Sequence, residues 1–382
     1  MQHLFEPADA HVAPSGLHRR WLAFRNRLLA SPRFRRAAHR FWPTRRIAQR
    51  QASELFDLIA GFAYSQILMA CVRLDVFDRL RSGPLRSDRL AGHGGLDELA
   101  WSDLLRAAAS LDLLSPVGDG EYVAGRLGVV MMEDASLQAM VHHHEHLYRD
   151  LVDPVALMRG DTDHAALNAY WPYAGGDGLS RDAATRYSDL MAASQPMVAE
   201  QVIDAFDFRR FRRLLDVGGG SGAFLRAVAV AAPDLELSLF DLPPVADLAR
   251  QSLADAGLAA RSSVHGGDFR RDALPQGHDL ISLVRIAHDH DDDTVLGLLE
   301  RIRDALAPGG AILIAEPMAG TREARRMGDA YFRVYLRAMG TGRPRTPDEL
   351  AGLLRRAGFR APVMHKTTIP MLARVLSCQV DT

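Results

Sequence analysis

The sequence predicts an α/β protein, with a doubly wound parallel sheet in its C-terminal half and a mostly helical N-terminal half. Residues 213–222 form a short apolar strand segment and a glycine-rich turn, directly followed by a helical segment. A strand, a tight turn and a helix N-terminus together form a site for a nucleotide-like ligand. Apolar strand segments then alternate with helical segments to the end of the chain, as in α/β folds. Apolar residues at helical spacing predict the helices of the first half.

The composition is that of an ordinary globular protein of two domains. The chain has 382 residues and a net charge of −1, and its two cysteines, Cys71 and Cys378, show no metal-ligand spacing. We therefore expect no disulfide framework and no metal cofactor. No secretory signal and no continuous run of 18 apolar residues are apparent, so the expected location is the cytoplasm, without a membrane span.

Residues 1–50 form an arginine-rich arm. Eleven arginines and no acidic residue lie between positions 17 and 50. Trp21, Phe24 and Leu28 share one helical face of this segment, and a basic helix that carries aromatic residues suits an anionic membrane surface. The alternative is a helix that packs on a partner subunit. We expect no nucleic-acid partner, because no nucleic-acid-binding module accompanies the arginines.

Residues 51–190 are predicted to form a helical domain. Apolar positions from Leu55 to Val72 indicate one long, largely buried helix, and further helices are expected near 87–90 and 99–111. A hairpin-like turn follows at 115–123, which completes the outline of a winged helix. The histidines within 142–146 point around a helix rather than at one ion, so we expect a solvated helix face. A loop at 171–179 and a helix from 182 to about 206 lead to a domain change near residue 190.

Residues 191–382 are predicted to hold the sheet. The expected strands are 213–217, 235–240, 262–264, 279–284 and 310–316, with two last strands near 362–368 and 371–378. The expected helices are 222–232, 245–257, 294–306 and 327–339. In such a sheet, ligands bind at the carboxyl ends of the strands.

The glycine turn and an acidic residue after the second strand indicate a nucleotide-like ligand. Gly218-x-Gly220-x-x-Ala223 formally fits a dinucleotide fingerprint, so an NAD-dependent oxidoreductase is one alternative. Asp241 lies 23 residues after Gly218, near the spacing expected for a carboxylate that binds ribose hydroxyls.

Three further residues lie just beyond strand ends and are candidates for chemistry. Asp268, beside Phe269, can hold an adenine by its amino edge and its face. His288 is the candidate general base, and Glu316 can fix its tautomer by accepting from the other ring nitrogen. The acidic run from Asp289 to 293 is expected to be a charge cluster at a helix N-terminus.

Five motifs occur in an order that resembles a known family. They are Leu-Leu-Asp-Val-Gly-Gly-Gly-Ser-Gly (214–222), Phe-Asp-Leu-Pro (240–243), Gly-Gly-Asp-Phe (266–269), Ala-His-Asp-His-Asp-Asp (287–292) and Ile-Ala-Glu-Pro (314–317). Together they resemble S-adenosylmethionine-dependent O-methyltransferases of the plant caffeate and bacterial polyketide type, from about residue 50 to the end. The resemblance implies His288 as base, supported by Glu316, and no metal. It implies a donor site formed by Asp216, Gly218, Gly220, Asp241, Leu242, Asp268, Phe269 and Arg285.

Two positions depart from the family pattern. Plant members have a second supporting glutamate directly before an Arg-Thr pair, where this chain has Pro344. The tryptophan that usually follows the His-Asp pair is His290 here. Both changes disfavour a small phenolic substrate.

Within the family, the arginine-rich arm and two segments, 55–62 and 330–340, resemble the acyclic carotenoid (hydroxyneurosporene/demethylspheroidene) O-methyltransferases of purple phototrophic bacteria. The resemblance implies a homodimer that methylates the tertiary 1-hydroxyl of such carotenoids, leaves S-adenosylhomocysteine, and makes peripheral contact with the inner or photosynthetic membrane. Met327, Tyr331 and Tyr335 would line the acceptor site, because they share the face of the expected helix 327–339. The alternatives are a polyketide phenol, a bacteriochlorophyll precursor, and a non-catalytic protein that keeps the fold.

Overall fold

The structure is a computed structural model that describes residues 16–161, 166–170, 194–321 and 324–380. It divides into two compact units, residues 1–142 and 143–382. Residues 143–190, which the sequence analysis assigned to the helical domain, thus fall in the second unit. The loop expected at 171–179 and the beginning of the helix expected from 182 lie outside the described residues.

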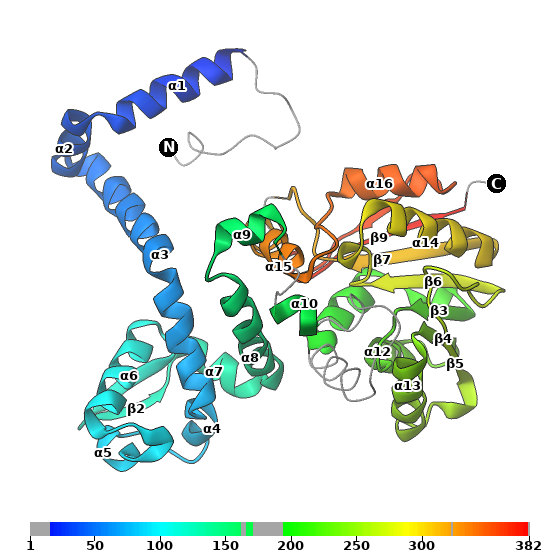
Figure 1. Cartoon of the computed structure of the whole chain (residues 1–382), viewed down its shortest axis with the longest axis horizontal. Helices are drawn as coiled ribbons and strands as arrows, with labels where there is room; N and C mark the ends of the chain where they lie inside the picture. Colours follow the sequence, from blue (N-terminus) through cyan, green and yellow to red (C-terminus); the bar gives the residue numbers. More distant parts are fainter. Residues whose placement is uncertain (1–15, 162–165, 171–193, 322–323, 381–382) are drawn as a thin grey trace. The chain divides into compact units, whose positions relative to one another are not determined.

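The first unit begins with three successive helices, which Figure 1 shows in blue. They are α1 (Gly16–Ala30), α2 (Pro32–Arg40) and α3 (Trp42–Arg73). Ser31 caps α2 by accepting a hydrogen bond from the Phe34 amide, and Pro32 occupies the first helical position, where its missing N–H has no cost. The described part of the arm, from residue 16 to residue 50, is therefore largely helical, and no residue of α1 is buried.

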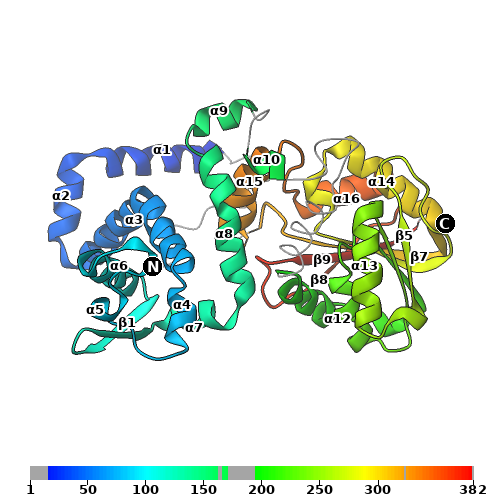
Figure 2. The same ribbon diagram turned by 60° about the horizontal axis from the view of Figure 1, so that its bottom comes forward.

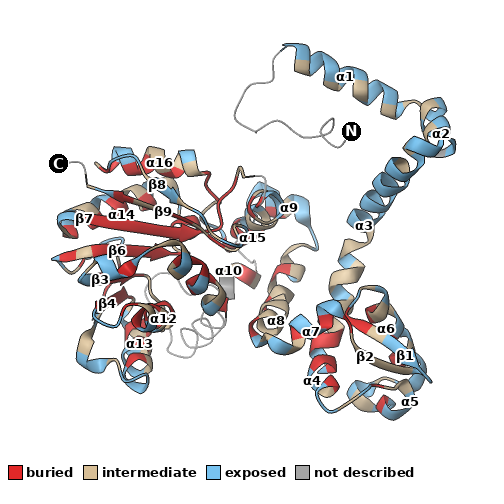
Figure 3. Cartoon of the chain, turned by 180° about the vertical axis from the view of Figure 1, so that it is seen from behind, coloured by how far each residue is buried: buried red, intermediate tan, exposed pale blue. Residues whose placement is uncertain are grey.

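The expectation of a largely buried long helix is wrong for α3 as far as about Phe62. Leu55, Leu58, Ile59 and Phe62 are exposed, and the buried residues of α3 all lie between Met69 and Val72. Figure 3 shows this change along α3 from pale blue to red. By length and composition, α3 is also the one helix among the described residues that could cross a membrane. It contains no continuous run of 18 apolar residues, so no span was expected from the sequence.

The rest of the first unit has the predicted order of short helices and a hairpin. The elements are α4 (Val76–Leu80), α5 (Ser87–Leu90), α6 (Glu98–Ser110), β1 (Leu114–Gly118), β2 (Glu121–Ala124) and α7 (Arg126–Glu133). β1 and β2 pair antiparallel. Phe77, Trp101 and Leu105 are fully buried in the core that joins these elements to the end of α3. The winged-helix outline is confirmed.

The second unit contains a sheet of seven strands in the order β5-β4-β3-β6-β7-β9-β8. The strands are β3 (Arg213–Val217), β4 (Glu236–Asp241), β5 (Ser262–Gly266), β6 (His278–Val284), β7 (Leu306–Glu316), β8 (Val363–His365) and β9 (Arg374–Gln379). The first five are parallel, and β9 runs antiparallel to both β7 and β8. Because β3 lies between β4 and β6, the order reverses there, and a ligand crevice is expected at its carboxyl end.

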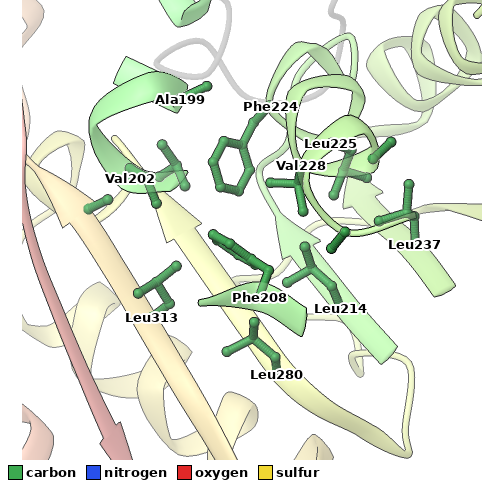
Figure 4. Close-up of a cluster of buried hydrophobic side chains, with 14 of the residues drawn as sticks. Ala199, Val202, Phe208, Leu214, Phe224, Leu225, Val228, Leu237, Leu280 and Leu313 are labelled. Carbon is green, nitrogen blue, oxygen red and sulfur yellow. The ribbon is translucent and has the colours of Figure 1, made fainter. Parts of the chain in front are cut away.

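Helices cover both faces of this sheet, as the doubly wound prediction requires. Those along the sheet are α12 (Ala223–Ala231), α13 (Pro243–Asp255), α14 (Asp292–Ala305) and α16 (Pro347–Arg356). Alternate strand residues point to opposite faces, so Leu214 packs with α12 and α13 while Leu215 packs with α14 and α16. Figure 4 shows the first of these cores, in which Phe208 and Phe224 meet the strands. In Figures 1 and 2, α14 lies beside α16.

The helix expected at 327–339 is two elements. A π-helical segment, η6 (Arg325–Tyr331), runs directly into α15 (Phe332–Met339). Among the described residues, the helices that precede the sheet in this unit include α8 (Ala135–Asp150), which crosses the division between the units, α9 (Pro154–Arg159) and α10 (Ala166–Tyr170). Residues 194–205 are helical too, as expected for the end of the helix that leads to the glycine strand. π-helical turns are rare in proteins as a whole, and those that occur are often at functional sites. η6 lies beside the candidate base described below.

Candidate active site

The glycine turn after β3 is packed so closely at Gly218 that it leaves no room for a side chain there. Gly218 has a positive φ of 74°, and a Cβ there would lie 2.4 Å from the Ile286 side chain. The Gly218 amide donates to the Phe240 carbonyl at 2.8 Å, which ties the turn to the end of β4. Gly220 faces open space. The turn therefore leaves a free approach for a ligand.

Two buried carboxylates lie beside this turn. Asp241 accepts from the amides of Gly220 (2.8 Å) and Leu242 (2.7 Å), and burial raises its pKa to about 6 against the effect of these bonds. Asp216 accepts from the Ser282 hydroxyl at 2.6 Å, and burial raises its pKa to about 7. Its Oδ2 has no hydrogen-bond partner among the described residues, although it is buried. An acceptor oriented in this way fits a ligand that brings a hydrogen-bond donor or positive charge.

Asp268 follows β5, where the sequence analysis expected it, but its side chain binds Arg270 by a paired interaction at 2.9–3.2 Å. Burial would raise the pKa of Asp268, but the hydrogen bonds and charge of Arg270 outweigh it and keep that pKa below its usual value. The ring of the adjacent Phe269 meets the His290 ring edge-to-face at 5.2 Å. Phe269 and His290 thus form an aromatic pair just beyond the end of β5.

His288 lies in a 3-10 turn, η5 (Ala287–Asp289), just after β6, and is buried. Its Nε2 lies 3.0 Å from Asp289 Oδ1, while Nδ1 lies 3.9 Å from Glu316 Oε2. Burial alone would lower the pKa of His288, but the charge and hydrogen bond of Asp289 and the charge of Glu316 outweigh it, so this pKa is raised. The site therefore holds a histidine between two carboxylates.

The expected tautomer contact with Glu316 differs in the structure. A separation of 3.9 Å is too long for a hydrogen bond, and Glu316 Oε2 instead accepts from the His288 backbone amide at 3.0 Å. Glu316 is fully buried, and burial raises its pKa. It holds the turn that carries the base, while Asp289, assigned from the sequence to a helix charge cluster, is the partner of the ring.

Arg345 and its neighbours hold the loop of His288, a role that no sequence signal indicated. The Arg345 side chain is 0% exposed; it donates to the carbonyls of Ala287 and His290 and to Asp292 Oδ1 at 2.9 Å. A Cβ on Gly342, which has a φ of 82°, would lie 2.3 Å from the His288 carbonyl. This close approach lets the segment 341–346 pack directly against the loop.

The residues expected to line an acceptor site lie on η6 and α15. Tyr331 and Tyr335 belong to one packed cluster, and Met327 is half-buried on η6. Phe332, which the sequence analysis did not name, connects this cluster to the base, because its ring lies 5.6 Å from that of His288.

The solvated helix face expected for the histidines of α8 is wrong for His143 and His144, while His142 is exposed as expected. His143 is buried and its Nε2 lies 2.7 Å from the hydroxyl of Tyr335, and His144 Nε2 lies 2.7 Å from that of Tyr331. The pairs join positions 192 and 187 residues apart, a separation at which local sequence carries no signal.

Arg285 occupies the turn between β6 and His288. Its φ is 60°, a conformation uncommon for a residue with a side chain, and its amide donates to the Ala315 carbonyl at 2.8 Å. Its guanidinium donates to the Ser194 hydroxyl at 2.7 Å. Across the described ranges, no cluster of three or more His, Cys, Asp or Glu residues is arranged to hold a metal ion.

Comparison with known families assigns this architecture. The family model of the O-methyltransferase domain matches residues 148–360, and that of the O-methyltransferase dimerisation domain matches residues 56–134. The chain belongs to the O-methyltransferase family. It is an S-adenosylmethionine-dependent O-methyltransferase, which sets aside the oxidoreductase alternative, and it carries the dimerisation domain of its family.

Two relatives of this methyltransferase share its length. Demethylspheroidene O-methyltransferase of Cereibacter sphaeroides is 47% identical over 87% of this chain and 88% of the relative. The enzyme of the same name from Rhodobacter capsulatus is 38% identical over 98% and 92%. Among solved structures, human N-acetylserotonin methyltransferase in complex with SAM has a TM-score of 0.75 and 26% identity, covering 87% of this chain and 98% of that one.

The residues at the ends of β3 and β4 fit the methyl donor of the family. The open turn at Gly220 leaves room for a close ligand, and the carboxylates of Asp216 and Asp241 are acceptors of the kind that the amino group and ribose hydroxyls of S-adenosylmethionine require.

Proposed function

We propose that this methyltransferase acts on the tertiary 1-hydroxyl of acyclic carotenoids of the hydroxyneurosporene/demethylspheroidene type. The 47% identity over 87% of the chain to demethylspheroidene O-methyltransferase carries the proposal. The aromatic cluster beside His288 supports it, since stacked rings give an apolar wall for a polyene end. A polyketide phenol or a bacteriochlorophyll precursor is the alternative acceptor.

The proposed donor site consists of Asp216, Gly218, Gly220, Asp241, Leu242, Asp268, Phe269 and Arg285. S-adenosylmethionine supplies an electrophilic sulfonium methyl when it is bound there. The chain's own task is to align the acceptor oxygen and remove its proton. His288 accepts that proton, and the charges of Asp289 and Glu316 stabilise the imidazolium that results. Met327, Tyr331 and Tyr335 are the proposed acceptor-site residues.

We further propose that residues 1–50 are an arm, 51–190 a dimerisation domain that covers the acceptor, and 191–382 the donor domain. The exposed apolar residues of α3 around Leu55–Phe62 fall at the beginning of the segment that the dimerisation model matches, which supports a homodimer. The arm supports a peripheral membrane contact, because Trp21 and Phe24 are exposed among its arginines and Arg25 lies 5.8 Å from the Trp21 ring.

The test is radiolabelled methyl transfer to two acceptor classes. Purified full-length protein would be given 1-hydroxylated acyclic carotenoids in detergent and, separately, caffeate-like phenols. The proposal expects a higher kcat/KM for the carotenoids. A higher kcat/KM for the phenols would refute the carotenoid assignment and leave the methyltransferase intact.

A further inference from the structure

An aromatic cluster lies beside the base within the second unit. We use this name for Tyr331, Phe332 and Tyr335. Phe332 lies 5.6 Å from the His288 ring, and its own ring meets Tyr331 at 5.1 Å and Tyr335 at 6.1 Å. Tyr331 and Tyr335 are stacked at 5.6 Å, with 27° between their planes. These rings are therefore candidates to contact an acceptor whose oxygen reaches His288.

Two adjacent histidines of α8 take up both hydroxyls of this cluster. His143 Nε2 lies 2.7 Å from Tyr335 and His144 Nε2 lies 2.7 Å from Tyr331. The ring planes are tilted or perpendicular rather than stacked, at 57° and 89°, so the histidines meet the tyrosines at the hydroxyl end. The neighbouring His142 is exposed and takes no part in either pair.

Both histidine rings are neutral near pH 7. Burial lowers the pKa of His143 to about 4, helped by the charges of His144 and His146, and burial lowers that of His144. Burial also raises the pKa of Tyr331, against the charge of Arg285. A neutral imidazole accepts at Nε2 when its proton is on Nδ1, and in this tautomer each tyrosine donates its single O–H to a histidine. Neither tyrosine then keeps a donor for another group.

We propose that His143 and His144 are specificity-determining residues of the acceptor site, which occupy the O–H groups of Tyr335 and Tyr331 so that the wall beside His288 offers ring surface and no hydrogen-bond donor. A hydrocarbon chain can pack against such a wall without losing any hydrogen bond. A phenol or carbonyl oxygen placed there loses its hydrogen bonds to water and gains none, which costs binding. The inference rests on the proposed function, because it explains how an apolar acceptor is preferred.

A purely structural role for the pairs makes a different prediction. If the histidines only fix α8 against α15, their loss would lower kcat/KM for every acceptor by the same factor. If they set specificity, their loss changes the ratio of the kcat/KM values for carotenoid and phenol. The ratio therefore separates the two roles.

The test compares His144→Leu, His143→Leu and the control His142→Leu in full-length protein, with a 1-hydroxylated acyclic carotenoid and a caffeate-like phenol as acceptors. Each of the first two should lower the carotenoid-to-phenol ratio of kcat/KM by about 10-fold, because a tyrosine O–H beside the acceptor loses its histidine partner. The control should keep the wild-type ratio. The double variant His144→Leu/Tyr331→Phe, which removes the unpaired hydroxyl as well, should restore the ratio to within about twofold of wild type.

An unchanged ratio in His143→Leu and His144→Leu, or no recovery in the double variant, would overturn the inference. Wild-type protein that prefers the phenol would instead refute the proposed function, so the two failures are distinguishable. Nitrogen-15 NMR of the histidine rings gives a readout that needs no variant to fold. Both rings should be neutral at pH 7 with the proton on Nδ1, and an imidazolium at either position would also overturn the inference.

Discussion

Replacing Arg345 by alanine should destabilise the protein and displace the loop that carries His288. The guanidinium is fully buried and joins three acceptors of that loop: the carbonyls of Ala287 and His290 and the carboxylate of Asp292. Arg345→Ala removes every one of these donors. The carbonyls of Ala287 and His290 then lose the hydrogen bonds that Arg345 gave them.

The size of the effect follows from burial. Removing one partner of a buried ion pair costs about 3–5 kcal/mol, because the remaining groups are left uncompensated. Asp292 is 41% exposed and regains water, so we expect the lower end, about 3 kcal/mol. Arg343 provides a control: it binds the same Asp292 at 2.9 Å and Glu349 at 2.7 Å, but its side chain is 37% exposed. Exposed pairs contribute about 0–1 kcal/mol each, so Arg343→Ala should cost less than about 2 kcal/mol.

The assay is urea unfolding of both variants, followed by turnover and S-adenosylhomocysteine binding of whatever remains folded. Arg345→Ala should lower kcat far more than it weakens S-adenosylhomocysteine binding, because the loop bears the base and Gly220 and Asp241 lie on other elements. Equal free energies of unfolding for the two variants would show that burial of Arg345 does not set its contribution. Wild-type kcat in a folded Arg345→Ala variant would show that the loop holds His288 without it.

Other perturbations test the remaining roles. Asp241→Ala should weaken donor binding, since each charge-assisted hydrogen bond contributes about 1.5–3 kcal/mol; unchanged affinity by calorimetry would contradict the ribose assignment. His288→Ala should slow methylation by about 10²–10⁴-fold with donor binding nearly intact, and wild-type turnover would mean that positioning alone suffices. The raised pKa of His288 places the acid limb of the kcat/KM profile above about pH 6.5, and Asp289→Asn should move it to lower pH; the same proton stabilises the fold below about pH 6.5, and this contribution disappears as pH rises through the folded pKa. Deleting residues 1–50 should reduce salt-sensitive binding to anionic vesicles and spare donor binding, whereas equal vesicle binding would favour packing on a partner subunit.

The sheet could be predicted from sequence because each of its strands carries a local signal. The strand before Gly218 and the acidic residue after β4 are both set by short-range chemistry: a turn that excludes side chains and a carboxylate at a strand end. The burial of α3 could not be predicted in this way. Leu55 and Phe62 are as apolar as Val72, and only the surrounding structure distinguishes a face that meets the core from one that does not.

The contacts between distant elements could not be predicted from the sequence, for a related reason. A histidine pair on α8 reads as a polar stripe until tyrosines 187 and 192 residues later come to lie against it. Arg345 likewise reads as a surface charge before a proline and a helix, although the fold buries it completely. In both cases the residue type is ordinary, and its partner is determined by the fold.

The acidic run after His288 shows how one pattern can hide separate roles. Asp289 ends the 3-10 turn and contacts the His288 ring, and His290 then adopts an extended conformation (φ −121°, ψ 155°). Asp291 consequently caps α14 by accepting from the Thr294 amide at 2.8 Å, while Asp292 faces Arg343 and Arg345. The helix N-terminal assignment is confirmed for Asp291 and Asp292 and misses Asp289. This extended residue, His290, is not indicated by any residue type in the run. It separates the carboxylate beside the base from the carboxylates that begin the helix. Asp289 is thus the carboxylate that contacts the ring nitrogen Nε2 of the base, and Pro344, where plant members carry a second supporting glutamate, supplies none.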